Sequence, residues 1–230
     1  MDLYGNIPAL LKQRPNWVVW GARDSPPKAP FEPASLLSGR LSAAKAGVKE
    51  TWGTYENAVE CVRRGLARGI GYEFDGGGIY GADLDHVIGA ERTLTPEARE
   101  VMDKLNSYTE VSPSGTGLHV FVFAPGVNIA RHRKKDCFLE IYGEARYFTV
   151  TGNILGGVRT IERRVAELQA VHDRFLLPEP ARQDGRPGRV GEQSGTSRAT
   201  DRRPLYCRRA ERPARRPLCK RVPNRRVSCG

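Results

Sequence analysis

An apolar strand that ends in two carboxylates is the feature that most constrains this chain. Residues 79–85 read Ile-Tyr-Gly-Ala-Asp-Leu-Asp, so Asp83 and Asp85 lie two positions apart. Because the side chains of a strand alternate between its faces, both carboxylates point to the same side. Two acidic groups on one face repel each other unless a cation lies between them. The pair predicts a divalent metal site at the end of a central strand; the alternative is a strand end that faces solvent or caps a turn.

A glycine-rich turn delivers a histidine to the start of another strand. Residues 112–119 read Ser-Pro-Ser-Gly-Thr-Gly-Leu-His, and residues 118–123 are almost entirely apolar. Glycines let a backbone approach phosphate oxygens, and hydroxyls and amides supply hydrogen-bond donors. The alternative is a turn whose glycines serve only positive φ values, followed by a core histidine. The unbroken order of turn, His119 and strand favours phosphate binding.

A third carboxylate, Glu140, lies among apolar residues in the segment Phe-Leu-Glu-Ile-Tyr at 138–142. A carboxylate in an interior strand needs a partner. A metal ion shared with Asp83 and Asp85 would supply one, and so would a salt bridge from Arg146 across a predicted hairpin. Arg146 also suits a phosphate or template contact, because a guanidinium matches phosphate geometry.

Basic and aromatic side chains offer further contacts to nucleic acid. A loop before the third carboxylate carries four cations that suit a DNA backbone, although a solvated loop explains them equally well: Arg131, Arg133, Lys134 and Lys135. Four aromatic residues could stack on bases, but core packing is the favoured interpretation of each: Trp17, Trp20, Trp52 and Tyr108.

Periodicity and punctuation predict a mixture of helices and strands. Helices are expected at 51–68, 96–105 and 162–175. Strands are expected at 15–20, 70–74, 79–85, 108–111, 118–123, 137–142 and 146–151. The proline-rich residues 21–34 are expected to form a loop. The strands 70–74 and 79–85 are expected to pair as a hairpin, as are 137–142 and 146–151.

The charge of the chain is confined to its C-terminal end. The formal net charge is +11, and the last 50 residues alone hold 15 basic and 4 acidic side chains, which accounts for the whole excess. Net charge is therefore no sign that the globular part binds DNA. We expect one catalytic domain at 1–178 and a basic, disordered tail at 179–230. The tail reads as a nucleic-acid-binding arm, a solvated linker, or a shifted or truncated reading frame.

Targeting and redox signals are consistent with a cytoplasmic protein. No secretory signal is recognisable at the N-terminus, and no apolar run approaches the length of a membrane span. The 5 cysteines form no zinc spacing, which fits a reducing compartment. We expect a cytoplasmic location without a membrane partner.

The ordered motifs resemble the archaeo-eukaryotic primase superfamily, and in particular the N-terminal domains of phage and plasmid bifunctional primase/polymerases. The resemblance rests on G-x-D-x-D at 81–85, S-P-S-G-x-G-x-H at 112–119, and E-I-Y followed by R-Y-F-T-V-T-G at 140–152. It extends over about residues 12–160. It implies an α+β fold of two αβ units, one like an RNA-recognition motif, with the active site between them.

The resemblance also implies roles for single residues. Asp83, Asp85 and Glu140 match the metal-binding acids, which hold two Mg²⁺ or Mn²⁺ ions, and His119 matches the histidine that contacts the phosphates of the incoming nucleotide. Other nucleotide-binding positions match Ser114, Gly115, Gly117 and Arg146. Many relatives have serine where this chain has Gly117. Relatives often continue into a helicase domain, and this chain does not.

The motifs therefore lead us to expect a DNA primase/polymerase, a nucleotidyltransferase of phage or plasmid replication. Its substrates would be nucleoside triphosphates and a single-stranded DNA template, and a separate replicative helicase would be a further partner. The first alternative is a replication-initiation module that binds DNA without catalysis. The second is a glycosyltransferase with a D-x-D metal site, which would leave His119 and Glu140 unexplained.

Overall fold

The computed structural model describes residues 3–23 and 25–178, so the expected tail at 179–230 lies outside the described residues. The helices are α1 (Ala9–Lys12), α2 (Pro33–Leu37), α3 (Tyr55–Arg63), α4 (Pro96–Leu105) and α5 (Val165–Phe175), with single 3₁₀ turns η1 (Leu3–Asn6) and η2 (Lys49–Thr51). The strands are β1 (Trp17–Trp20), β2 (Pro30–Phe31), β3 (Gly69–Asp75), β4 (Ile79–Leu84), β5 (Thr109–Val111), β6 (Leu118–Phe123), β7 (Leu139–Tyr142) and β8 (Glu144–Val150).

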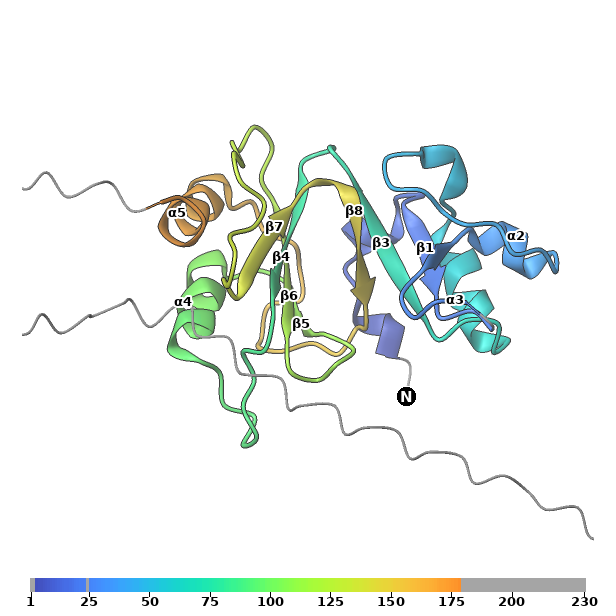
Figure 1. The fold of residues 1–230 in the computed structure, drawn as a ribbon, viewed down its shortest axis with the longest axis horizontal. Helices are drawn as coiled ribbons and strands as arrows, with labels where there is room; N and C mark the ends of the chain where they lie inside the picture. Colours follow the sequence, from blue (N-terminus) through green and yellow to red (C-terminus); the bar gives the residue numbers. More distant parts are fainter. Residues whose placement is uncertain (1–2, 24, 179–230) are drawn as a thin grey trace, which may run out of the picture.

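The strands form two antiparallel sheets, which confirms the expected α+β class. Sheet A has the order β2-β1-β3-β8, and sheet B has the order β5-β6-β4-β7. The two sheets lie between the helices, with α4 and α5 beyond sheet B and α2 and α3 at the opposite end with sheet A (Figure 1).

Neither expected hairpin forms. The chain passes from β3 in sheet A to β4 in sheet B, and returns from β7 in sheet B to β8 in sheet A. The two crossings lie next to each other, because the amide of Gly76 donates to the carbonyl of Gly143 over 2.9 Å. Alternation of apolar residues indicates which face of a strand is buried, but it does not indicate which neighbouring strand supplies the hydrogen bonds. Sequence proximity was therefore the wrong guide to pairing here.

Glycine 81 allows the two sheets to approach each other closely. A Cβ at this position would lie 2.4 Å from Cε2 of Phe148 and 2.5 Å from Cζ of Phe74, both from sheet A. These aromatic rings pack edge to face with centroids 4.9 Å apart. Sheet A therefore packs directly onto the inner face of β4, just two residues before Asp83.

Two hydrophobic clusters hold the layers together. The first lies between the sheets and joins aromatic residues from both, namely Trp17, Tyr72, Phe74, Tyr108, Phe121 and Phe148. The second lies between the other face of sheet B and the helices α4 and α5, and it includes Ala82, Leu84, Leu118, Val120, Val101 and Leu168. Both faces of sheet B are thus covered, which explains the nearly continuous apolar run of β6.

The helix boundaries follow from their capping residues. Thr54 accepts from the amide of Asn57 and begins α3, so this helix is shorter than the expected 51–68. Thr95 accepts from the amide of Ala98, and Pro96 occupies the first turn of α4. The expected loop at 21–34 is interrupted by β2 and by the start of α2. Proline is tolerated in an edge strand and at the first turn of a helix, which is why these elements escaped detection.

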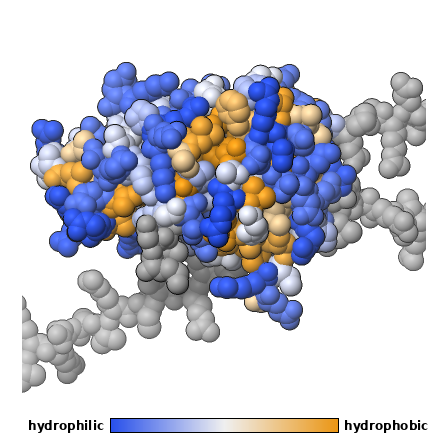
Figure 2. All heavy atoms as spheres, turned by 180° about the vertical axis from the view of Figure 1, so that it is seen from behind, coloured by the Kyte–Doolittle hydropathy of each residue, from blue (hydrophilic) through white to orange (hydrophobic). Residues whose placement is uncertain are grey.

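The surface of the described residues exposes few large hydrophobic side chains, of which Leu41 is the most exposed at 52%. Seen from behind, hydrophilic and hydrophobic residues are mixed, with a large hydrophobic area near the middle of this face (Figure 2). Within 3–23 and 25–178, none of the helices is both long and apolar enough to span a bilayer.

Candidate active site

Charged side chains from every strand of sheet B lie in one row across the sheet. Asp83 on β4 is paired directly with His119 on β6 and with Glu140 on β7. His119 is in turn paired with Glu110 on β5. On the other side, Glu140 forms an isolated bridge with Arg133. Directly opposite residues of antiparallel strands share a face, so these five side chains lie side by side.

The row lies on the face of sheet B that is turned toward sheet A. Neighbouring positions on this face, Ile79 and Phe121, belong to the cluster between the sheets. Exposure increases along the row: the side chain of Glu110 is 0% exposed, that of His119 6%, that of Asp83 21% and that of Glu140 23%. The row is therefore closed at the β5 end and open to solvent at the β7 end.

Asp83 is a partly buried carboxylate whose negative charge is incompletely balanced by nearby positive charge. The pKa of Asp83 is raised to about 6, mainly by burial and also by the negative charges of Asp85 and Glu140, while His119 and Arg146 act in the opposite direction. Asp85 follows the last residue of β4 and is exposed, with its amide held by the carbonyl of Phe138 at 2.8 Å. The two aspartates thus keep the expected spacing, but only Asp83 lies within the sheet.

His119 is held between two carboxylates. Its Nε2 lies 3.6 Å from Oδ1 of Asp83, and its Nδ1 lies 3.5 Å from Oε1 of Glu110. Its ring packs on that of Phe148 with centroids 5.0 Å apart. Burial alone lowers the pKa of His119, but its hydrogen bond to Glu110 and the charges of Asp83 and Glu110 outweigh burial, so the pKa is raised. The site therefore favours a cationic imidazole, which suits contact with a phosphate.

Glu110 is the site residue that sequence reasoning missed. It is wholly buried, and its carboxylate accepts from the amides of Thr151 and Gly152 and from the hydroxyl of Tyr108. The available signal was a glutamate in the extended segment Tyr-Thr-Glu-Val at 108–111, a weaker form of the signal that singled out Glu140. It was overlooked because β5 has only three residues, too few to show which face is buried.

Glu140 has two partners on the open side of the row. The hydroxyl of Tyr142 donates to its Oε2 over 3.0 Å, and Nη2 of Arg146 lies 3.8 Å from the same atom. The guanidinium of Arg146 also lies over the ring of Tyr142, 5.0 Å from its centroid. The salt bridge that competed with a metal-ligand role for Glu140 thus exists. Because Arg146 is half exposed, the contact is weak and leaves the guanidinium free to move to a phosphate.

The expected phosphate-binding turn presents a chain of hydroxyl groups. Ser114 lies 3.0 Å from Ser112 and 3.1 Å from Thr116, measured between side-chain oxygens, and all these side chains are at least partly exposed. The carbonyl of Thr116 accepts from the amides of Val87 and Ile88, which places the turn against the segment that follows Asp85. A Cβ at Gly117 would lie 2.8 Å from the carbonyl oxygen of Leu84, so the side chain that many relatives carry here has no room in this conformation.

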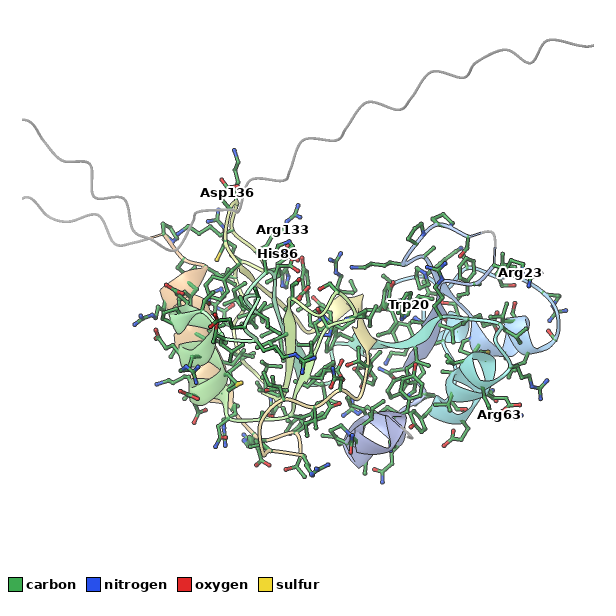
Figure 3. All side chains as sticks on the ribbon, turned by 90° about the horizontal axis from the view of Figure 1, so that it is seen from below. Trp20, Arg23, Arg63, His86, Arg133 and Asp136 are labelled. Atoms are coloured by element: carbon green, nitrogen blue, oxygen red, sulfur yellow. The ribbon has the colours of Figure 1, made fainter. Side chains whose placement is uncertain are left out.

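The loop before β7 carries four basic residues, and one of them, Arg133, pairs with a residue of the row. Arg133 is the bridge partner of Glu140, and the ring of His132 stacks on that of Tyr142 with centroids 5.2 Å apart. Seen from below, Arg133 lies at the same end of the molecule as His86, which follows Asp85, whereas Arg23 and Arg63 lie at the opposite end (Figure 3). Only Arg133 of the four loop cations is thus placed beside a carboxylate of the row.

The aromatic residues considered as base-stacking candidates pack in the core instead. Trp17, Trp52 and Tyr108 are buried. Trp20 is half-buried, and its indole N–H donates to the carbonyl of Ile70. This is the arrangement that the sequence favoured.

The chemistry of the carboxylates suits a divalent cation. Among the residues that the structure describes, no three His, Cys, Asp or Glu side chains form a complete ligand set. Mg²⁺ does not need one, because it usually takes one or two carboxylates together with waters and substrate phosphates. The raised pKa of Asp83 shows that its negative charge is poorly balanced by the protein. A cation near Asp83, Asp85 and Glu140 would balance it.

Comparison with known proteins supports a relationship to DNA primase-polymerases. No protein-family model matches the chain. The chain is 32% identical over 158 residues to the protein named DNA Primase-polymerase from Nitratiruptor phage NrS-1. The match covers 66% of this chain and 21% of the phage protein, so the chain spans about a fifth of that protein's length. Its similarity is thus to one part of a larger primase-polymerase.

Proposed function

We propose that this chain is a template-dependent nucleotidyltransferase that makes or extends primers on single-stranded DNA in phage or plasmid replication. The observation that most directly supports this proposal is the row of charged side chains on sheet B, in which Asp83 is paired directly with both His119 and Glu140. Three motifs that lie far apart in the sequence thus meet at one place. The similarity to a phage DNA primase-polymerase supports the same activity.

The proposed reaction is transfer of a nucleotide to a 3′-hydroxyl. The hydroxyl oxygen bonds to the α-phosphorus of a nucleoside triphosphate and loses its proton to water, and the bond from that phosphorus to the β-phosphate oxygen breaks, releasing pyrophosphate. Asp83, Asp85 and Glu140 would hold two Mg²⁺ or Mn²⁺ ions. When bound, such ions activate the attacking hydroxyl and stabilise the leaving group.

The other residues of the site would bind and orient the triphosphate. His119 would contact the phosphates from within the row, because its raised pKa favours the cationic form. The hydroxyl and amide groups of the turn at 112–117 would donate to phosphate oxygens. Arg146 and Arg133 would approach from the open, β7 side of the row. Positioning and charge neutralisation of this kind are the main tasks in phosphoryl-type transfer.

The test is a synthesis assay with matched variants. The full chain is incubated with single-stranded DNA, labelled nucleotides and Mg²⁺ or Mn²⁺, with and without a primer, beside Asp83→Asn and Asp85→Asn. Asp103→Asn is the control, because this residue is an exposed aspartate on α4. We expect product from the wild type and the control, a loss of at least about 100-fold in the other variants, and no product with a chelator.

The other outcomes identify the competing functions. DNA binding without product in any reaction would indicate a replication-initiation module that lacks catalysis. Transfer of a sugar from a nucleotide sugar, without DNA binding, would indicate a glycosyltransferase. Equal product from wild type and Asp83→Asn would place the active site elsewhere.

A further inference from the structure

Glu110 lies behind His119 and has a dense set of hydrogen bonds. Its Oε1 accepts from the amide of Thr151 at 2.9 Å, and its Oε2 accepts from the amide of Gly152 at 3.0 Å and from the hydroxyl of Tyr108 at 2.8 Å. The remaining neighbour is Nδ1 of His119, 3.5 Å from Oε1. The carboxylate is 0% exposed, so it cannot itself touch a substrate.

These contacts bear on the protonation of Nδ1 of His119. An ionised carboxylate only accepts hydrogen bonds, and the three other partners of Glu110 all donate to it. A proton on Nδ1 of His119 would complete this set of donors, and Nε2, on the opposite side of the ring, lies 3.6 Å from Oδ1 of Asp83. A histidine whose second nitrogen is bound by a carboxylate is fixed in both tautomer and ring orientation. The ring is also held by Phe148, with centroids 5.0 Å apart.

A simpler role for Glu110 is to join the sheets. Thr151 and Gly152 follow directly after β8 of sheet A, and Glu110 belongs to β5 of sheet B. A neutral carbonyl group could accept from these amides without bringing a charge into the interior. Burying a carboxylate is costly, and within residues 3–23 and 25–178 no Lys or Arg forms an ion pair with Glu110. A negative charge on Glu110 is explained if it holds and stabilises the imidazole of His119. This imidazole is the only basic group in contact with Glu110 among the described residues.

We propose that Glu110 is a positioning residue, which holds His119 with Nδ1 protonated and Nε2 directed at the triphosphate of the bound nucleotide. The second half of this statement rests on the proposed function. The first half concerns the imidazole alone and is independent of it.

The first test reads the imidazole directly. The chain has 4 histidines, so ¹⁵N-histidine spectra of the full protein are simple, and the signal of His119 is the one absent from His119→Asn. We expect Nδ1 of His119 to carry a proton at every pH at which the protein is folded, including alkaline pH where the ring is neutral. An unprotonated Nδ1 at alkaline pH would overturn the proposal.

The second test is a double-mutant cycle on nucleotide affinity. The dissociation constant of a nucleoside triphosphate in Mg²⁺ buffer is measured for wild type, Glu110→Gln, His119→Asn and the double variant. We expect Glu110→Gln to weaken binding about 10–100-fold in the wild-type background. We expect less than about a twofold effect in the His119→Asn background, because the group through which Glu110 acts is gone. Equal effects in both backgrounds would show that Glu110 only supports the fold.

Stability measurements and a matched control separate positioning from folding. Glu73→Gln changes another glutamate that is 0% exposed; it lies on β3, and its carboxyl oxygens form no hydrogen bond with His119. It should leave nucleotide affinity within about twofold of wild type. If Glu110 has only a structural role, Glu110→Gln should lower the melting temperature by the same amount in the wild-type and His119→Asn backgrounds. It should also weaken nucleotide binding by the same factor in both. If the wild type binds no nucleotide, the proposed function fails, and the spectrum of His119 still decides the role of Glu110.

Discussion

Asp83 and His119 face each other across β4 and β6, with Oδ1 of the aspartate 3.6 Å from Nε2 of the imidazole. This pair partly offsets the charge of Asp83, but the neighbouring acids Asp85 and Glu140 work against it. The residue proposed to be most important for catalysis is thus a destabilising one in the protein without its ligands.

Asp83→Asn should therefore abolish synthesis and stabilise the fold. The amide has nearly the shape of the carboxylate but removes the repulsion from Asp85 and Glu140. We expect the melting temperature at pH 8 without divalent cations to rise by about 2–4 °C. Added Mg²⁺ should raise the melting temperature of the wild type and not that of the variant. A lower melting temperature for Asp83→Asn in metal-free buffer would contradict this account.

Glu73 should make stability depend on pH. Both carboxyl oxygens are buried without a hydrogen-bond partner, and burial raises the pKa of Glu73 to about 7 from its ordinary 4.5. Between these values the folded chain binds more protons than the unfolded chain, so stability falls as pH rises through this window and the destabilisation is complete above it. Glu73→Gln should raise the free energy of unfolding by about 1–3 kcal/mol at pH 8 and change it little at pH 4.5.

Urea denaturation of both proteins at the two pH values measures this difference. The same change at pH 4.5 and pH 8 would mean that packing, not ionisation, determines the effect of the substitution.

Gly81→Ala should destabilise the contact between the sheets. The added Cβ would collide with the rings of Phe148 and Phe74, at 2.4 and 2.5 Å. We expect a loss of about 1–3 kcal/mol in the free energy of unfolding, the usual cost of overpacking a core. Gly157→Ala is the control, because a Cβ there meets no heavy atom within 4 Å. Equal stability of the two variants would show that the sheets can separate without cost.

Arg133→Gln should weaken nucleotide binding more than Lys135→Gln. Both residues belong to the same exposed loop, but Arg133 is the bridge partner of Glu140. We expect KM for the nucleoside triphosphate to rise about tenfold for Arg133→Gln and less than about twofold for Lys135→Gln, as for one lost charge-assisted hydrogen bond. Comparable increases in KM would indicate a diffuse effect of net charge, and would remove Arg133 from the proposed site.

Individual residues of the candidate site could be predicted because each stands out locally. Asp83, Glu140 and His119 are polar residues inside apolar strands, and alternation alone indicates that Asp83 and Asp85 point to one face. Most helices and strands were predictable for the same reason, since periodicity and caps are properties of neighbouring residues. This signal was weak for Glu110, which lies in a three-residue strand, and absent for Arg133, which lies in a loop.

The sequence by itself determined most of the strands and the longer helices, that the fold mixes the two, and which side chains are too polar for their apolar surroundings. Tertiary structure alone decided that β3 and β4, and likewise β7 and β8, belong to different sheets. It also decided the register that aligns Glu110, His119, Asp83 and Glu140 in one row. The physical reason is that strand pairing depends on contacts between residues far apart in the chain, and a slip of one residue would turn these side chains to the opposite face.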